Sequence, residues 1–261
     1  MCNAFCALVS SVLSNPWFQN IASNLLTILI IAVVGWLILR FTRRAQLLSF
    51  FGLKDRKQIL VYLSNVRVQL GGSVGVDSQP RSYAGTTIPE NEAILIPVFQ
   101  RLFNFVIPGL AEQPGFFKWL LVSDVAVEAL PSPSHVSEVE KASTFIAVGS
   151  PAYNSASLRL EQTLNPLARF NDQYSGFKLD DVPDITDTRC SFVLRVFDQT
   201  SEQTAFYVAG MSALGTTGAA YFLATRWGYL AKKYKDSKPF CVVLRIPGDD
   251  PRTHEVLFEK G

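Results

Sequence analysis

Small, hydroxyl-bearing and amide residues follow three of the strands that the sequence predicts, and these residue types suit contacts to a phosphate or a ribose. Glycine lets a ligand approach the backbone, hydroxyls donate to phosphate oxygens, and the first N–H groups of a following helix favour an anion. The candidates are Ser64, Asn65, Gly71 and Gly72 after the first strand, Gly149, Ser150 and Asn154 after the third, and Gly210, Ser212, Gly215, Thr216 and Thr217 after the fifth. One such turn is ordinary turn chemistry, so the prediction of a ligand site depends on their combination.

Carboxylates are the only plausible catalytic groups. Glu90 and Glu92 follow the glycine-rich segment 71–87, and Glu161 lies on the predicted helix after GSPAYN. Such a carboxylate could stabilise the positive charge that develops on a ribose when an N-glycosidic bond is split. The helix dipole explains Glu90 equally well, and a solvated helix face explains Glu161. We therefore expect binding without catalysis, and N-glycosidic bond hydrolysis if a reaction does occur.

Residue patterns that would identify other chemistries are missing. The chain has no G-x-G-x-x-G after the first predicted strand, no G-x-x-x-x-G-K-[ST] and no G-x-S-x-G. We interpret its two histidines, His135 and His254, as solvated side chains. No C-x-x-C pair occurs among the four cysteines, so we expect no metal site and no cofactor. Cys190 and Cys241 are interpreted as small buried residues.

The elements that must position these residues alternate between strand and helix. Apolar, β-branched runs predict strands, and Pro and acidic residues at helix starts help to place the helices. The expected strands are 58–68, 125–130, 144–151, 191–197, 204–210, 240–246 and 254–260, and the expected helices are 89–105, 135–142, 155–165 and one opening after residue 210. Residues 166–189 are predicted to be a long loop. This alternation predicts an α/β fold, a Rossmann-like three-layer domain with a mostly parallel sheet, and the pair 191–197 and 204–210 adds an antiparallel hairpin.

An apolar segment precedes this domain. Residues Leu25–Leu39 read LLTILIIAVVGWLIL, and no charged side chain occurs before Arg40. With the uncharged residues before it, the run approaches the roughly 20 residues that a membrane-spanning helix needs. A signal peptide would begin with basic residues and end at small ones, and this run does neither. We therefore predict a tail and single transmembrane helix over 1–44, with the span at about 20–40.

The charge distribution predicts the orientation. Basic residues such as Arg43 and Lys57 follow the span and none precedes it, so the positive-inside rule places the C-terminal part in the cytoplasm. Residues 45–57 are expected to form a basic juxtamembrane linker, and 58–261 the cytoplasmic domain of a single-pass cell-membrane protein. The net charge of only +2, without a basic run among aromatics, predicts no direct nucleic-acid binding.

A single N-terminal span joined to a domain with GSPAYN (149–154) and AGMSALGTTGAA (209–220) turns resembles the membrane-anchored Rossmannoid effectors of prokaryotic nucleotide-signalling and anti-phage defence systems. The resemblance implies a domain that senses a nucleotide-derived small molecule, a homo-oligomer, and a bilayer helix that assembles or rearranges on binding. The site is also similar to nucleoside deoxyribosyltransferase and TIR-type NAD-cleaving folds, although no catalytic Glu of those families is clearly placed. A membrane-tethered NAD or nucleotide N-glycohydrolase and a non-catalytic scaffold are the alternatives.

Overall fold

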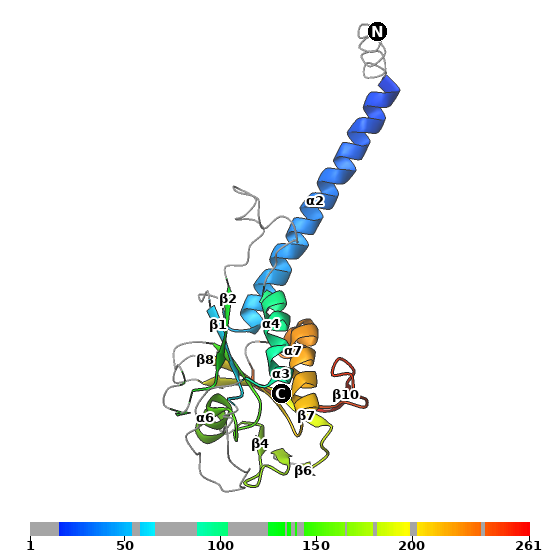
Figure 1. The fold of residues 1–261 in the computed structure, drawn as a ribbon. Coiled ribbons are helices and arrows are strands. Elements are labelled where there is room, and N and C mark those ends of the chain that lie inside the picture. Colours follow the sequence, from blue (N-terminus) through cyan, green and yellow to red (C-terminus); the bar gives the residue numbers. More distant parts are fainter. Residues whose placement is uncertain are drawn as a thin grey trace. The chain divides into compact units, whose positions relative to one another are not determined.

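The computed structural model describes most of the chain, as shown in Figure 1. The described residues are 16–53, 58–65, 88–103, 125–133, 135–136, 139, 144–164, 166–179, 182–198, 203–235 and 238–261. Contacts divide the chain into two compact units, Met1–Gln46 and Leu47–Gly261. The expected glycine-rich loop 71–87 and the FFKWLLVSD segment (116–124) lie outside the described residues.

Helix α2 (Pro16–Phe50) carries the apolar segment of the first unit. Among the described residues, Ser23–Phe50 is the one helix long and apolar enough to cross a membrane, with a mean hydropathy of 2.4 and no part of its most apolar window buried. The side chains from Leu25 to Leu39 are accordingly mostly exposed. Thr27 donates its hydroxyl to the Ser23 carbonyl at 2.8 Å, so the helix itself satisfies this polar side chain.

The second unit contains a mostly parallel seven-stranded sheet in the order β10-β9-β7-β8-β3-β1-β2. Its strands are β1 (Gln58–Leu63), β2 (Ala126–Pro131), β3 (Phe145–Val148), β7 (Cys190–Asp198), β8 (Gln203–Gly210), β9 (Phe240–Arg245) and β10 (Glu255–Lys260). β2, β1, β3 and β8 are parallel neighbours. β7 pairs antiparallel with β8 and with β9, and β10 pairs antiparallel with β9. The predicted hairpin is therefore confirmed.

Both faces of this sheet are covered. In β1, Ile59 and Val61 belong to one hydrophobic core, whereas Leu60 and Tyr62 belong to the other. The first core contains residues of α4 and α7 and the second contains residues of α6, and Figure 1 shows these helices on opposite sides of the sheet. The helices are α3 (Glu90–Ala93), α4 (Leu95–Phe103), α6 (Ser155–Thr163) and α7 (Ala213–Lys233). The predicted α/β class is thus confirmed, and Cys190 and Cys241 are buried as expected.

Two local predictions differ from the structure. Residues 166–189, expected to be a loop, contain a small sheet in the order β4-β5-β6, formed by Ala168–Phe170, Phe177–Leu179 and Val182–Ile185. These strands are so short that the surrounding polar and proline residues hid their alternation of buried and exposed side chains. The helix expected over 89–105 is divided at Ile94 into α3 and α4.

The folded unit starts earlier than residue 58. Leu47, Phe50, Phe51 and Leu53 are buried in the first core, although the sequence assigned them to a linker. Phe50 also lies under the guanidinium of Arg195, at 5.2 Å from its ring centroid. Arg195 is itself 1% exposed and donates to main-chain carbonyls that follow α7. The end of α2 is therefore part of the domain's core.

Fragments test this boundary. We expect residues 47–261 to unfold cooperatively and residues 58–261 to fail to fold. Each large side chain lost from a core costs about 2–5 kcal/mol, and four such losses rival a total stability of about 5–15 kcal/mol. Thermal unfolding followed by near-UV circular dichroism is the measurement. Equal unfolding midpoints for the two fragments would contradict the assignment of Leu47–Leu53 to the core.

Candidate functional site

Strands β1 and β3 are parallel neighbours whose following helices lie on opposite faces of the sheet. After β1 the chain forms α4, whose Phe99 packs in the first core, and after β3 it forms α6, whose Leu160 packs in the second. In open α/β sheets, ligands bind beyond the carboxyl ends of the strands at such a reversal. We define the β1/β3 edge as the four residues that directly follow these strands. They are Ser64, Asn65, Gly149 and Ser150, all predicted from the sequence.

The carboxylate of Glu92 lies at this edge. Glu92 Oε2 accepts a hydrogen bond from the Ser64 backbone N–H at 2.6 Å, and the residue is only 5% exposed. Burial raises the pKa of the Glu92 carboxyl, and hydrogen bonds from the Ser64 side chain and backbone lower it in part. Glu90 is exposed in the first turn of α3 and has no comparable contact with the edge. Of the two predicted glutamates, only Glu92 is brought to the strand ends.

Gly149 brings the chain close to Ser64 and Glu92. Its φ of +104° is a conformation that side chains with a Cβ rarely adopt. A Cβ there would collide with the Ser64 hydroxyl and stand 3.2 Å from Glu92 Oε1. The Gly149 N–H donates to the Val208 carbonyl at 2.9 Å, so the turn also joins β3 to β8. Gly149, the first residue of GSPAYN, therefore needs to be glycine for two reasons: its positive φ, and the lack of room for a Cβ.

Asn154 fastens the start of α6. Its Oδ1 accepts from the N–H groups of Ala156 and Ser157 at 2.9 and 3.3 Å. Its Nδ2 donates to the carbonyls of Tyr62 and Val148 at 2.9 and 2.7 Å. Side chains of the protein thus occupy the first N–H groups of α6. The predicted contact of Asn154 with a ligand is replaced by a link between α6 and the ends of β1 and β3.

Hydrogen bonds and tight packing within the turn between β8 and α7 hold it together. Ser212 caps α7 by accepting from the Gly215 N–H at 3.1 Å, and Thr216 Oγ1 accepts from the Gly210 N–H at the same distance. A Cβ on Gly210 would lie 2.6 Å from the Gly215 carbonyl carbon. Thr217 donates to the Ala213 and Asn91 carbonyls, which places this turn beside α3. These five predicted residues lie near the edge, but packing and capping already use their polar groups.

Few of the residues predicted to contact a ligand have polar side-chain atoms that are not already hydrogen-bonded within the protein. Asn65 donates to the Ser132 carbonyl at 2.9 Å, while its buried Oδ1 accepts no hydrogen bond from the residues described. The Ser64 side chain is buried, hydrogen-bonds Glu92 and lies 3.4 Å from the Val148 carbonyl, whereas Ser150 is partly exposed. Gly71 and Gly72 lie outside the described residues. The groups left at the edge are therefore the Asn65 amide oxygen, the Ser150 hydroxyl and the carboxylate of Glu92.

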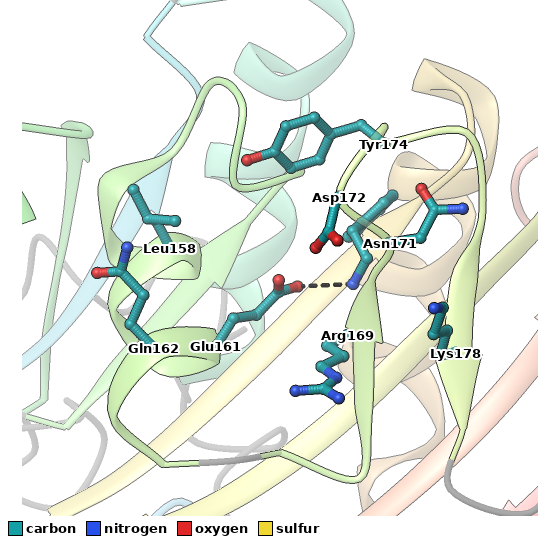
Figure 2. Close-up of a pocket in the computed structure, with 9 residues that line it drawn as sticks. Leu158, Glu161, Gln162, Arg169, Asn171, Asp172, Tyr174 and Lys178 are labelled. Atoms are coloured by element: carbon teal, nitrogen blue, oxygen red, sulfur yellow. Dashed lines mark hydrogen bonds between the residues drawn. The ribbon is translucent and has the colours of Figure 1, made fainter.

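Glu161, the third predicted glutamate, lies elsewhere. Its Oε1 accepts from the Phe170 N–H at 3.0 Å and from the Tyr207 hydroxyl at 2.8 Å, on the face of the second core. Burial raises the pKa of Glu161, and burial and the Glu161 carboxylate together raise that of Tyr207. Glu161 faces an open cavity of about 340 Å³, named here the α6/β4 cavity (Figure 2). It is lined by Leu158, Glu161, Gln162, Arg169, Phe170, Asn171, Asp172, Tyr174 and Lys178.

Sequence reasoning missed the partners of Glu161. Arg169, Asp172 and Lys178 come from the segment that was predicted to be a loop, and Tyr207 was one apolar member of a predicted strand. The alternation of apolar and charged side chains at Ala168, Arg169 and Phe170 was the available sign of a strand, but three residues are too few to establish one. No group of three or more His, Cys, Asp or Glu side chains suited to a metal occurs in the described part of the chain.

Comparisons with protein-family models, with curated proteins and with solved structures found no match to this chain. Proposals for its function therefore rest on the geometry and chemistry of its own residues. Its distinctive polar features are the buried carboxylate of Glu92, the partly buried carboxylate of Glu161 and the polar groups left at the β1/β3 edge.

Replacing Gly149 by alanine tests the tight turn at the edge. We expect Gly149→Ala to lower the free energy of unfolding by about 1–3 kcal/mol, because alanine is strained at this φ and its Cβ collides with Ser64. Urea unfolding measures the change. Gly248→Ala is the matched control, since open space surrounds a Cβ there, and it should change stability by less than about 0.5 kcal/mol. Equal stability of the two variants would refute the constraint.

The buried Glu92 carboxyl predicts a pH dependence. Because its pKa in the folded chain is raised above the ordinary 4.5, its contribution to stability is complete below pH 4.5 and is lost as pH rises through the folded pKa. Glu92→Gln removes this titration while its amide oxygen can still accept from Ser64. The stability of Glu92→Gln relative to the original chain should therefore rise with pH, measured by urea unfolding from pH 4 to 8. Glu90→Gln, an exposed change on the same helix, is the control, and a flat difference for Glu92→Gln would disprove the idea.

Proposed function

We propose that this chain is a membrane-anchored receptor whose domain binds a nucleotide-derived ligand at the β1/β3 edge. The observation that carries the proposal is the reversal between β1 and β3, with Glu92 and the unpaired Asn65 Oδ1 at that position. The parallel order β2-β1-β3-β8, with helices on both faces, supports the interpretation of this part of the sheet as Rossmann-like. Such sheets commonly bind nucleotides at the reversal, which supports this class of ligand.

The chemistry of the edge favours the nucleoside part of such a ligand. In dinucleotide-binding sheets an acidic side chain from another position accepts hydrogen bonds from ribose hydroxyls, and a carboxylate near the strand ends offers the same chemistry. Glu92, Asn65 Oδ1 and the hydroxyl of Ser150 are suited to the same contact. The first N–H groups of α6 are occupied by Asn154, so a phosphate finds few main-chain donors there. The ligand is therefore held through sugar hydroxyls and the base.

Helix α2 provides the coupling to the membrane in this proposal. Its apolar residues cross the bilayer, with the basic residues that follow on the cytoplasmic side. Its last turn contributes Leu47 and Phe50 to the domain's core, so a ligand that repacks this core changes α2 directly. The proposed output is assembly or rearrangement of α2 in a homo-oligomer, as in membrane effectors of nucleotide-signalling defence systems.

A second candidate function rests on Glu92 alone. A buried carboxylate with a raised pKa, held by Ser64 beside a sugar-binding position, can stabilise positive charge on a ribose during cleavage of an N-glycosidic bond. The chain is then a membrane-tethered NAD or nucleotide glycohydrolase. This candidate assigns the role to Glu92 and not to Glu161, because the hydrogen-bond partners of Glu161 lie in β4 and β8, away from the edge.

Ligand binding is tested on the full-length chain in detergent with NAD and a panel of linear and cyclic nucleotides. A ligand at 100 times its Kd adds about 2.7 kcal/mol, which raises the unfolding midpoint by roughly 5–10 °C. We expect such a shift for at least one compound. Ser150→Trp should abolish it by filling the edge, while Thr225→Trp, an equally bulky change at an exposed position on α7, should keep it.

Product formation in the same tubes separates the two candidates. Stabilisation without turnover, together with a change in particle mass by light scattering, supports the receptor. Turnover that is lost in Glu92→Gln, with binding retained, supports the hydrolase. No shift with any compound, or equal shifts in both tryptophan variants, would reject a nucleotide site at the edge and leave a non-catalytic membrane scaffold.

A further inference from the structure

The α6/β4 cavity contains an acidic side that lacks a cation. Glu161 Oε1 accepts two hydrogen bonds, whereas its Oε2 accepts none from the residues described. Figure 2 shows the carboxylate of Asp172 turned toward that of Glu161, below the ring of Tyr174. Burial dominates the electrostatics of Glu161, and the attraction of Arg169 only weakly opposes it. A cationic donor in the cavity would pair with both carboxylates.

The cavity lining also includes two basic side chains. Arg169 on β4 and Lys178 on β5 are directly paired across these antiparallel strands, and both side chains are exposed and line the cavity. Like charges directly opposite each other destabilise a strand pair. No carboxylate in the described part of the chain forms an ion pair with either residue. An anionic group bound between them would relieve this repulsion.

We propose that the α6/β4 cavity is a second ligand site, and that it binds a small zwitterion of the free amino acid type. The ammonium group lies between Glu161 and Asp172, and the carboxylate lies between Arg169 and Lys178. Leu158 and Tyr174 offer apolar surface to a side chain. The volume of about 340 Å³ is at the lower end of the roughly 300–1,000 Å³ typical of small-molecule sites.

This site is separate from the nucleotide site proposed above. Its residues come from α6, β4, β5 and the turn between these strands, on the face of the second core, while Glu92 precedes α4 on the face of the first. The two proposals can therefore fail independently. A variant in which neutral residues replace the charged residues of the cavity should leave the nucleotide-induced shift of the unfolding midpoint unchanged.

Isothermal titration of the full-length chain in detergent with the 20 L-amino acids tests the proposal. Amine-only probes (n-butylamine, phenethylamine) and an acid-only probe (butyrate) are titrated beside them. We expect at least one amino acid to bind at least about 10-fold more tightly than any of these analogues, because only a zwitterion meets both charged sides. Equal binding of an amine-only probe, or no binding of any amino acid, would overturn the zwitterion site.

Substitutions locate the bound molecule. Arg169→Ala and Lys178→Ala remove exposed side chains, so the fold should persist while amino acid affinity falls about 10-fold or more. Glu161→Gln retains an acceptor for Phe170 and Tyr207 but loses the charge, and should weaken the amino acid without affecting butyrate. Lys232→Ala, an exposed lysine on α7, is the matched control and should bind as the original chain does. An equal loss in Lys232→Ala would show that the binding is unspecific and reject the cavity.

Discussion

Burial of the central strands on both faces is the constraint on which the rest of this domain depends. Every residue of β3 and β8 is buried, and so is β1 after its first residue. Such strands need helices on both sides, which is why successive connections place α4 and α7 on one face and α6 on the other. Within such a sheet a polar side chain needs a partner, as the carbonyl contacts of Arg195 illustrate. Polar groups free to meet a ligand are consequently concentrated at the strand ends.

At the β1/β3 edge, residues that hold the strand ends together also belong to the proposed ligand site. Glu92 fastens α3 to the end of β1 through the Ser64 N–H, and Gly149 allows β3 to end against the same two side chains. Asn154 then ties α6 to both strands. The carboxylate is held at the proposed ligand site, and its burial raises its pKa. One hydrogen-bonded arrangement thus fixes the ends of β1 and β3 and the position of the Glu92 carboxylate.

Hydrogen bonds connect this edge with the second carboxylate. Ser157 donates to the Gly149 carbonyl at 2.7 Å and also interacts with the Tyr207 hydroxyl, which in turn donates to Glu161. All of these groups belong to α6, β8 or the turn after β3. A change in the position of α6 therefore alters the surroundings of both carboxylates.

Much of the fold follows from local sequence. The apolar run Leu25–Leu39 lies in one helix, the β-branched runs form β1, β3, β7, β8 and β9, and the hairpin of β7 and β8 pairs as expected. These features depend on side-chain polarity repeated at short spacing, which the sequence records directly. The three-residue strands β4 and β5 were missed for the same reason, because they contain too few residues to show a period. Leu47 and Phe50 were taken for linker residues because nothing local indicates that they are buried in the first core, where Phe50 meets Phe206 of β8 and Phe240 of β9.

For the candidate site, too, some features follow from local sequence and others depend on the tertiary structure. By itself the sequence determined that glycines, hydroxyls and a few glutamates follow the strands, and it determined where an apolar helix lies. Only the tertiary structure decided that Glu92, rather than Glu90, reaches the β1/β3 edge, and that Asn154, Ser212 and Thr216 are used in capping and turns. It alone placed Glu161 beside Tyr207 and Arg169. The reason is physical: residue type fixes which hydrogen bonds a side chain can make, whereas burial and partners come from chain segments far apart in sequence.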